Sequence, residues 1–174
     1  YDDRVVYSHF GGIVNCNWKV AGEAFIEGFH SLATHPQMME WLGDENTQYD
    51  VIKGENWSRQ IVPQGVPSPT IANHISEQEV LDSYYETRAF YTQGKGRDLA
   101  VGDDGTPRVP SDSTARRELA AAMRSALAEQ FGSDQDHWTD SELLDGIQYF
   151  VFPNLYVFAG PRTNAIYRFR PLGN

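Results

Sequence analysis

Residues 17 to 36 read NWKVAGEAFIEGFHSLATHP and carry two histidines, His30 and His35, five positions apart. Aromatic and small side chains recur in this stretch at the spacing of one helix face. They are Trp18, Ala21, Phe25 and Phe29. We therefore predict a helix over residues 18 to 30, with this stripe against a core. Glu27 precedes His30 by three positions, so a helix places both side chains on one neighbouring face.

The two histidines can approach one another only if this helix ends or bends between them. A step of five residues turns about 140° on an ideal α-helix, which separates the two imidazoles. Pro36 follows His35 directly, and the residue before a proline avoids the helical conformation. We therefore expect both rings to converge at the end of the helix, where they could bind one metal ion. Spacing alone is also compatible with two hydrogen-bonded histidines that have a structural role.

The run from Asn17 to Pro36 resembles the segment that opens the iron site in the α-subunits of Rieske non-haem iron oxygenases, the ring-hydroxylating family. The resemblance implies that His30 and His35 are iron ligands. It implies a catalytic role for Glu27, as the acidic residue that relays electrons from the iron–sulfur cluster of a neighbouring subunit. Many members have Asn after the first glutamate, where this chain has Ala24, and many have Asp at the position of Glu27.

Two later stretches resemble, in order and spacing, the late strands of the same domain. They are YFVFPN at residues 149 to 154 and RFRPLG at residues 168 to 173. The resemblance implies one catalytic domain over residues 1 to 174, truncated at both ends, with a helix-grip fold similar to that of the START proteins. In the family the third iron ligand is an aspartate after these strands. No Asp or Glu follows Asp145, so we expect that ligand beyond Asn174.

The resemblance also implies an activity and its partners. It implies an oxidoreductase that uses mononuclear Fe(II) and O₂ to hydroxylate or demethylate an aromatic or other hydrophobic small molecule. Such an enzyme would be a dioxygenase or a monooxygenase and would act in aromatic hydrocarbon catabolism. Electrons would come from a Rieske [2Fe-2S] cluster in the parent protein and from a ferredoxin or reductase, and the parent subunit would form a homo-oligomer, a trimer. Two His and one carboxylate hold Fe(II) and leave positions open for O₂ and substrate. A non-catalytic ligand-binding module of helix-grip type is the alternative.

The pattern of the whole chain predicts an α+β fold, an antiparallel sheet wrapped around helices. Predicted strands lie at 4 to 16, broken by two glycines, and at 48 to 53, 56 to 62, 146 to 152, 155 to 159 and 164 to 170. Predicted helices lie at 76 to 91 and 114 to 131, and the pairs Ser76 with Glu79 and Thr139 with Glu142 read as capping boxes. The polar stretch from 94 to 111 is predicted to be a mobile loop.

We expect a cavity between the predicted helix at residues 18 to 30 and the late strands, and such a cavity is a common place for a ligand. We expect a hydrophobic substrate to contact four phenylalanines there. They are Phe25, Phe29, Phe150 and Phe158.

The composition argues against several classes of partner. The formal net charge is −10, whereas nucleic acid or an anionic membrane surface would call for a basic face. No apolar run approaches the roughly 18 residues of a membrane span. Cys16 is the only cysteine, which excludes an internal disulfide and a Rieske cluster within these residues. A single thiol favours a reducing compartment, and we expect a cytoplasmic protein.

Other metal chemistry fits the sequence less well. Glu27 and His30 have the Glu-x-x-His spacing of di-iron proteins, but those need a second such motif on a four-helix bundle. The His-Glu-x-x-His motif of zinc hydrolases is missing. The run Asp134-Gln135-Asp136-His137 contains possible ligands, but in a loop after a helix we interpret it as solvated surface.

Overall fold

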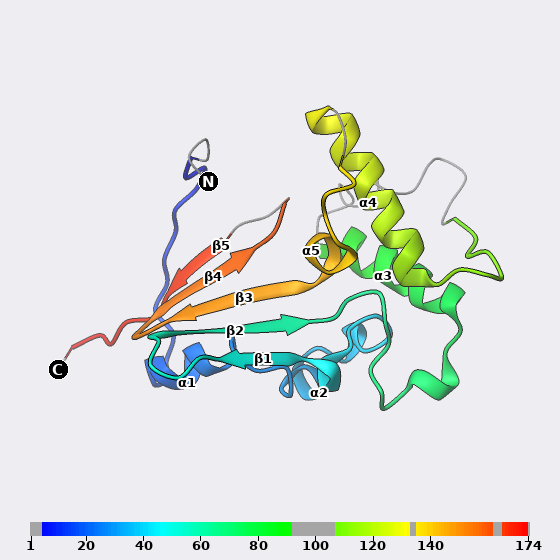
Figure 1. The fold of residues 1–174 in the computed structure, drawn as a ribbon. Helices are drawn as coiled ribbons and strands as arrows, with labels where there is room; N and C mark the ends of the chain where they lie inside the picture. Colours follow the sequence, from blue (N-terminus) through cyan, green and yellow to red (C-terminus); the bar gives the residue numbers. More distant parts are fainter. Residues whose placement is uncertain (1–4, 92–106, 133–134, 162–164, 174) are drawn as a thin grey trace.

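A five-stranded antiparallel sheet and a group of helices make up the chain (Figure 1). The computed structural model describes residues 5–91, 107–132, 135–161 and 165–173. The strands are β1 (Gln48–Val51), β2 (Trp57–Val62), β3 (Gly146–Val151), β4 (Leu155–Ala159) and β5 (Ala165–Arg168). Their order across the sheet is their order in the sequence. The α+β fold class predicted from the sequence is confirmed.

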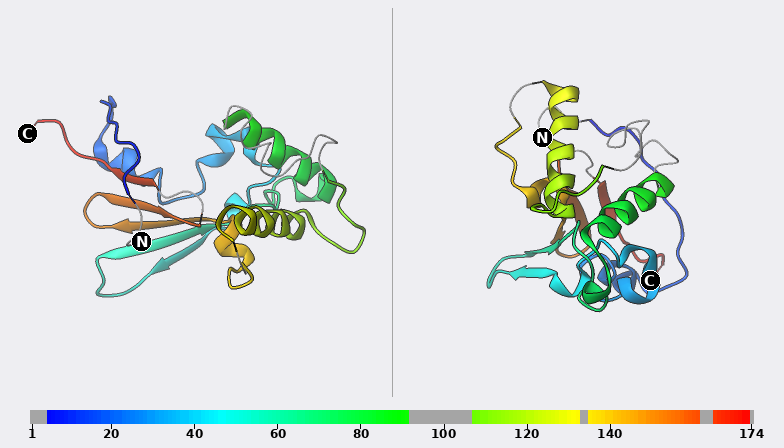
Figure 2. Two further views of the ribbon diagram at one scale, coloured as in Figure 1. Left: turned by 90° about the horizontal axis from the view of Figure 1, so that it is seen from above. Right: turned by 90° about the vertical axis from the view of Figure 1, so that its right-hand side faces the viewer.

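The long helices pack against one another at one end of the sheet (Figures 1 and 2). The two long helices are α3 (Glu77–Tyr91) and α4 (Ala115–Phe131), and the short helix α5 (Asp140–Leu144) packs with them. The buried residues of the core that they share are Met39, Trp41, Leu42, Val80, Leu81, Tyr84, Tyr85, Ala115, Leu119, Ala120, Leu127, Leu143 and Leu144. The main hydrophobic core therefore lies among the helices. Among the described residues no helix is both long and apolar enough to cross a membrane.

The ends of these helices follow the predicted signals. Both capping boxes are present: the backbone N–H of Ser76 donates to Glu79, and Thr139 exchanges two bonds with Glu142. The α4 helix ends at Gly132, whose φ of 70° is readily adopted only by glycine. Because these signals act within a few residues, the local sequence is enough to determine where the helices begin and end.

The segment that begins with α1 (Trp18–Glu23) lies over one face of the sheet (Figure 2). It leads to α2 (Ser31–Thr34) and to the 3-10 helices η1 (Pro36–Met38) and η2 (Asp44–Asn46), whereas a third 3-10 helix, η3 (Ala72–His74), lies between β2 and α3 in the sequence. Four residues stand opposite one another on β1 to β4 and form a row across the covered face. They are Tyr49, Gln60, Gln148 and Phe158. Gln60 Nε2 donates to the carbonyl oxygen of Phe25 at 3.3 Å, which attaches the covering chain to the sheet.

A partly buried ion pair joins the helices to the ends of β2 and β3. Arg116, in the first turn of α4, donates from Nη1 and Nη2 to the two carboxylate oxygens of Asp145, at 2.6 and 3.0 Å. Asp145 comes directly before β3, and its Oδ1 also accepts the backbone N–H of Gln64, just after β2, at 3.0 Å. The Asp145 side chain is 5% exposed. The pair therefore fixes α4 relative to the sheet.

The N-terminal strand prediction is wrong. Residues 5 to 16 contain no strand, and their large apolar side chains are exposed, among them Val6, Tyr7, Phe10 and Ile13. A strand is stable only when a neighbouring backbone completes its hydrogen bonds, and no strand of the described part pairs with these residues. Of the predicted loop from 94 to 111, only residues 107 to 111 lie within the described residues. Asp134 of the Asp-Gln-Asp-His run also lies outside them.

Candidate functional site

The segment that carries the candidate ligands is not one continuous helix. The α1 helix ends at Glu23, and the N–H of Phe25 then bonds to the carbonyl three residues back, on Gly22, at 2.9 Å. Such tighter bonds close the last turn of a helix. The N–H of Gly28 donates instead to the Tyr49 hydroxyl of strand β1, at 2.9 Å. The helix predicted over 18 to 30 is therefore correct for Trp18–Glu23 and wrong beyond them, where at Gly28 a side chain of the sheet takes the place of the helical partner.

The two histidines lie close together at the two ends of the short helix α2, because the backbone leaves the helical conformation at His35, with φ of −131° and ψ of 48°. His30 directly precedes α2 and His35 directly follows it. Their ring centroids lie 5.5 Å apart, with an interplanar angle of 74°. Since imidazole nitrogens bind metal ions at roughly 2 Å, rings at this separation can share one ion. The two rings converge as the sequence predicts, although they do so around a four-residue helix.

Glu27 holds His30 at two points. Its Oε1 lies 2.5 Å from Nδ1 of the imidazole, and its Oε2 accepts the backbone N–H of His30 at 3.0 Å. Because the carboxylate occupies Nδ1, the nitrogen that remains for an ion is Nε2. The two side chains are about one-third exposed, at 31% for His30 and 30% for Glu27. Both are therefore accessible from outside the chain.

The described part of the chain contributes two imidazoles to a possible metal site. Within it, no group of three or more His, Cys, Asp or Glu residues is arranged to hold a metal ion. Two imidazoles suit the two histidine positions of a facial set for Fe(II), which one further carboxylate would complete. The two imidazoles thus fit the Fe(II) that the sequence resemblance implies. The third ligand, which we expect beyond Asn174, stays a prediction.

Three of the four predicted substrate-contacting phenylalanines belong to one aromatic cluster between α1 and the sheet. The Phe25 ring meets the Phe158 ring edge-on at 6.3 Å, and Tyr156 contacts both Phe25 and Phe150, at 6.3 and 5.0 Å. The cluster also includes Tyr167 and Phe169. Burial, and then the nearby charge of Glu23, raise the pKa of the Tyr156 phenol.

Phe29 lies apart from this cluster. It is 66% exposed and stacks on Tyr49, with ring centroids 6.4 Å apart. A groove of about 400 Å³ lies elsewhere, between α3 and the chain that precedes it. Its lining residues are Glu40, Ile71, His74, Ile75, Glu79, Asp82, Ser83 and Glu86. None of the four phenylalanines lines this groove, and their contact with a substrate stays a prediction.

Sequence reasoning missed the residues that shape the turn between Glu27 and His30. A Cβ atom on Gly28 would lie 2.7 Å from the Thr47 hydroxyl, so only glycine fits there without displacement. Tyr49 holds the same turn from the sheet. The alternation of a strand predicts which side chains share a face of the sheet with Tyr49. It does not predict which face is covered, or which segment of the chain covers it.

A comparison with known proteins gives the family of the chain. A family model described as ring hydroxylating alpha subunit, catalytic domain, matches residues 1–174. No curated protein and no solved structure gives a significant match. The antiparallel sheet with its helices is consistent with the helix-grip catalytic domain that the sequence predicted. The match covers the whole chain, which therefore belongs to the family of ring-hydroxylating oxygenase alpha subunits, as all or part of the catalytic domain.

Proposed function

We propose that this chain is the iron-binding part of a Rieske-type oxygenase that hydroxylates or demethylates an aromatic or other hydrophobic small molecule. The observation that supports it most is the approach of His30 and His35, with Glu27 on the His30 ring, in a chain of the ring-hydroxylating family. Ferrous iron bound there would supply the activation of O₂ beside the substrate. Both monooxygenation and dioxygenation are compatible with this site.

In this proposal the residues of the chain have distinct roles. His30 offers Nε2 to the ion, while Glu27 fixes the ring orientation through Nδ1 and makes the imidazole a stronger ligand. Glu27 is also exposed enough to contact a cluster histidine of a neighbouring subunit, which would make it part of the electron path. The aromatic cluster around Phe25 would favour a flat apolar substrate.

The electron source in this proposal lies outside the chain. A Rieske [2Fe-2S] cluster takes two cysteines and two histidines, whereas Cys16 is the only cysteine here. We infer that the cluster belongs to the parent protein, that a ferredoxin or reductase supplies it with electrons, and that the parent subunit forms a homotrimer. A reducing compartment such as the cytoplasm would keep the exposed thiol of Cys16 reduced.

Iron binding by the full-length protein tests the proposal. Iron is removed and ferrous iron is restored without oxygen, and bound iron is then measured in the wild type and in the variants His30→Ala and His35→Ala. We expect either variant to lose most of the bound iron. His74→Ala is the matched control, because His74 is exposed and lines the separate groove. Unchanged iron content in all three variants would refute the site, whereas a wild type that binds no ferrous iron would favour a non-catalytic binding module.

Glu27→Gln separates iron binding from electron transfer. Glutamine keeps the size of the side chain but offers one oxygen where Glu27 offers two to His30. We expect iron content close to wild type and a loss in reductase-driven turnover of about 10- to 100-fold, as for other residues that support a metal ligand. Turnover is compared at equal iron loading, and equal rates would mean that Glu27 is only a surface residue.

A further inference from the structure

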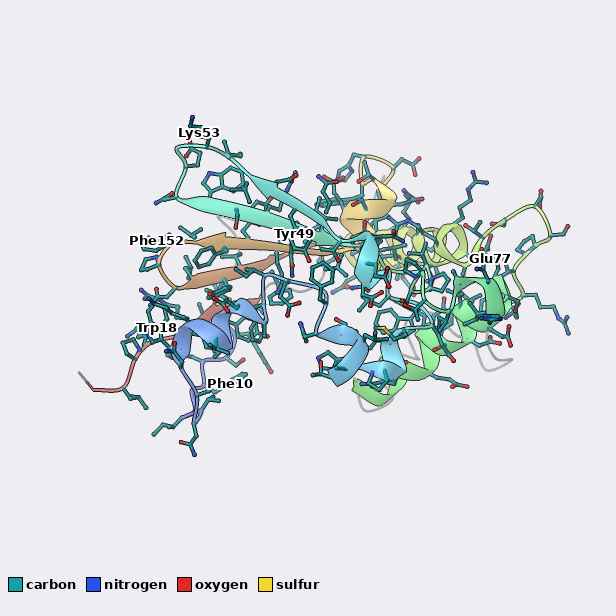
Figure 3. The ribbon with its side chains drawn as sticks, turned by 90° about the horizontal axis from the view of Figure 1, so that it is seen from below. Phe10, Trp18, Tyr49, Lys53, Glu77 and Phe152 are labelled. Atoms are coloured by element: carbon teal, nitrogen blue, oxygen red, sulfur yellow. The ribbon has the colours of Figure 1, made fainter. Side chains whose placement is uncertain are left out.

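We propose that Tyr49 is a positioning residue for this site, because its side chain holds the turn in which Glu27 faces His30. The inference rests on the proposed function of the same two residues, but the geometry that supports it requires no metal ion. Tyr49 belongs to strand β1, 19 residues after His30 in the sequence. In Figure 3 it lies beside the chain that links α1 to α2.

The first observation is that Tyr49 contacts both residues that separate Glu27 from His30. Its hydroxyl accepts the backbone N–H of Gly28 at 2.9 Å. Its ring stacks with Phe29 at a centroid distance of 6.4 Å and an interplanar angle of 23°. A hydrogen bond to a strand residue directs the Gly28 amide toward the sheet instead of along a helix. The turn therefore takes its orientation from β1.

The second observation is that Gly28 is also enclosed from another direction. A Cβ atom there would lie 2.7 Å from Thr47 Oγ1 and 3.0 Å from the carbonyl oxygen of Asp44. Those two atoms are themselves fixed, because the Thr47 hydroxyl donates to that carbonyl at 2.6 Å. The backbone at Gly28 thus lies between the Tyr49 hydroxyl and the residues that lead into β1.

These contacts have a consequence for the imidazole. Glu27 reaches Nδ1 of His30 only while the turn keeps the two side chains on the same side. That contact favours the tautomer with its proton on Nδ1, which leaves Nε2 able to bind an ion. Without the Tyr49 hydroxyl, the Gly28 amide loses its acceptor and the turn gains freedom. We therefore expect His30 to populate the other tautomer more often.

Tyr49→Phe tests this inference because it removes one oxygen and keeps the ring. The tautomers of His30 are measured by long-range ¹H–¹⁵N correlation on the metal-free chain, at a pH where the imidazole is neutral. We expect the ratio of the Nε2–H to the Nδ1–H form to rise about two- to tenfold, the change that one hydrogen bond of ordinary net strength produces. Gly28→Ala disturbs the turn from the opposite side and should change the ratio in the same direction.

Tyr149→Phe is the matched control. It removes the same atom from the same sheet, but the Tyr149 ring lies beside Trp57 and Arg59 on the face away from the turn. This variant should leave the His30 tautomers unchanged. Thermal unfolding of each variant distinguishes positioning from stability: a lower midpoint for Tyr49→Phe with unchanged tautomers would refute the inference.

The two proposals can fail separately. Unchanged tautomers in Tyr49→Phe refute the role of Tyr49 and leave iron binding by His30 and His35 intact. A shifted ratio together with iron binding that does not depend on these histidines supports the role of Tyr49 in the turn and refutes the proposed function instead.

Discussion

The ion pair between Arg116 and Asp145 provides a quantitative test of how the helices are held to the sheet. Asp145→Ala removes the acceptor for two Arg116 bonds and for the backbone N–H of Gln64. It leaves a guanidinium that is 23% exposed and an N–H without this partner. Removing one member of a buried pair costs about 3–5 kcal/mol. Because Arg116 can partly rehydrate, we expect a loss near the lower limit, about 3 kcal/mol.

The pair between Arg124 and Asp140 is a control with the same chemistry. Its shortest nitrogen–oxygen distance is also 2.6 Å, but the two side chains are 28% and 40% exposed. Exposed pairs contribute about 0.2–1 kcal/mol, since water already solvates both charges well. We therefore expect Asp140→Ala to lower the free energy of unfolding by about 1 kcal/mol at most.

Urea unfolding followed by tryptophan fluorescence measures both losses, because Trp41 is buried in the helical core and Trp138 packs against it. Equal losses for the two alanine variants would refute the argument that burial, and not pairing alone, determines the cost. The double variant Arg116→Met with Asp145→Leu should recover much of the lost stability, because no unpaired charge remains inside.

Two further predictions concern packing and pH. A Cβ atom on Gly22 would overlap the Tyr156 hydroxyl, so Gly22→Ala should cost about 1–3 kcal/mol, whereas Gly11→Ala, with no atom within 4 Å, should be neutral in thermal unfolding. Burial raises the pKa of Tyr85 from 10.0 to about 12. The unfolded chain therefore loses this proton first, and stability should fall as pH rises from about 10 to 12, by up to about 3 kcal/mol. Tyr85→Phe should flatten that slope in alkaline unfolding curves, and an unchanged slope would contradict the assignment.

Elements with local signals could be predicted from the sequence. The α5 helix begins where Thr139 and Glu142 satisfy each other's backbone groups, and both residues lie within one turn. The strand at Leu155–Ala159 agrees with its predicted bounds, since alternation and a short turn identify it without distant information. The convergence of His30 and His35 was predictable because the helix had to break between them.

The parts of the structure that could not be predicted from the sequence depend on contacts between distant residues. The apolar periodicity of residues 18 to 30 is helical, but the segment leaves the helix where Gly28 meets Tyr49, 21 positions later. The residues from 5 to 16 alternate like a strand, yet no described strand pairs with them. In both segments the local sequence does favour the predicted element, but contacts with distant residues decide the structure. The first segment has such a contact at Tyr49, and residues 5 to 16 have no paired strand in the described part of the chain.

One pair of residues on neighbouring strands holds the backbone that leads to His30. Tyr49 and Gln60 stand opposite each other on β1 and β2, and they bind the backbone of Gly28 and of Phe25. Opposite residues in a sheet lie roughly 5 Å apart, which is close to the rise of three residues along a helix. This match lets the sheet hold the turn in a compact shape after the helix has ended. A slip of one residue between β1 and β2 would turn one of the two side chains to the other face and release the turn that presents His30.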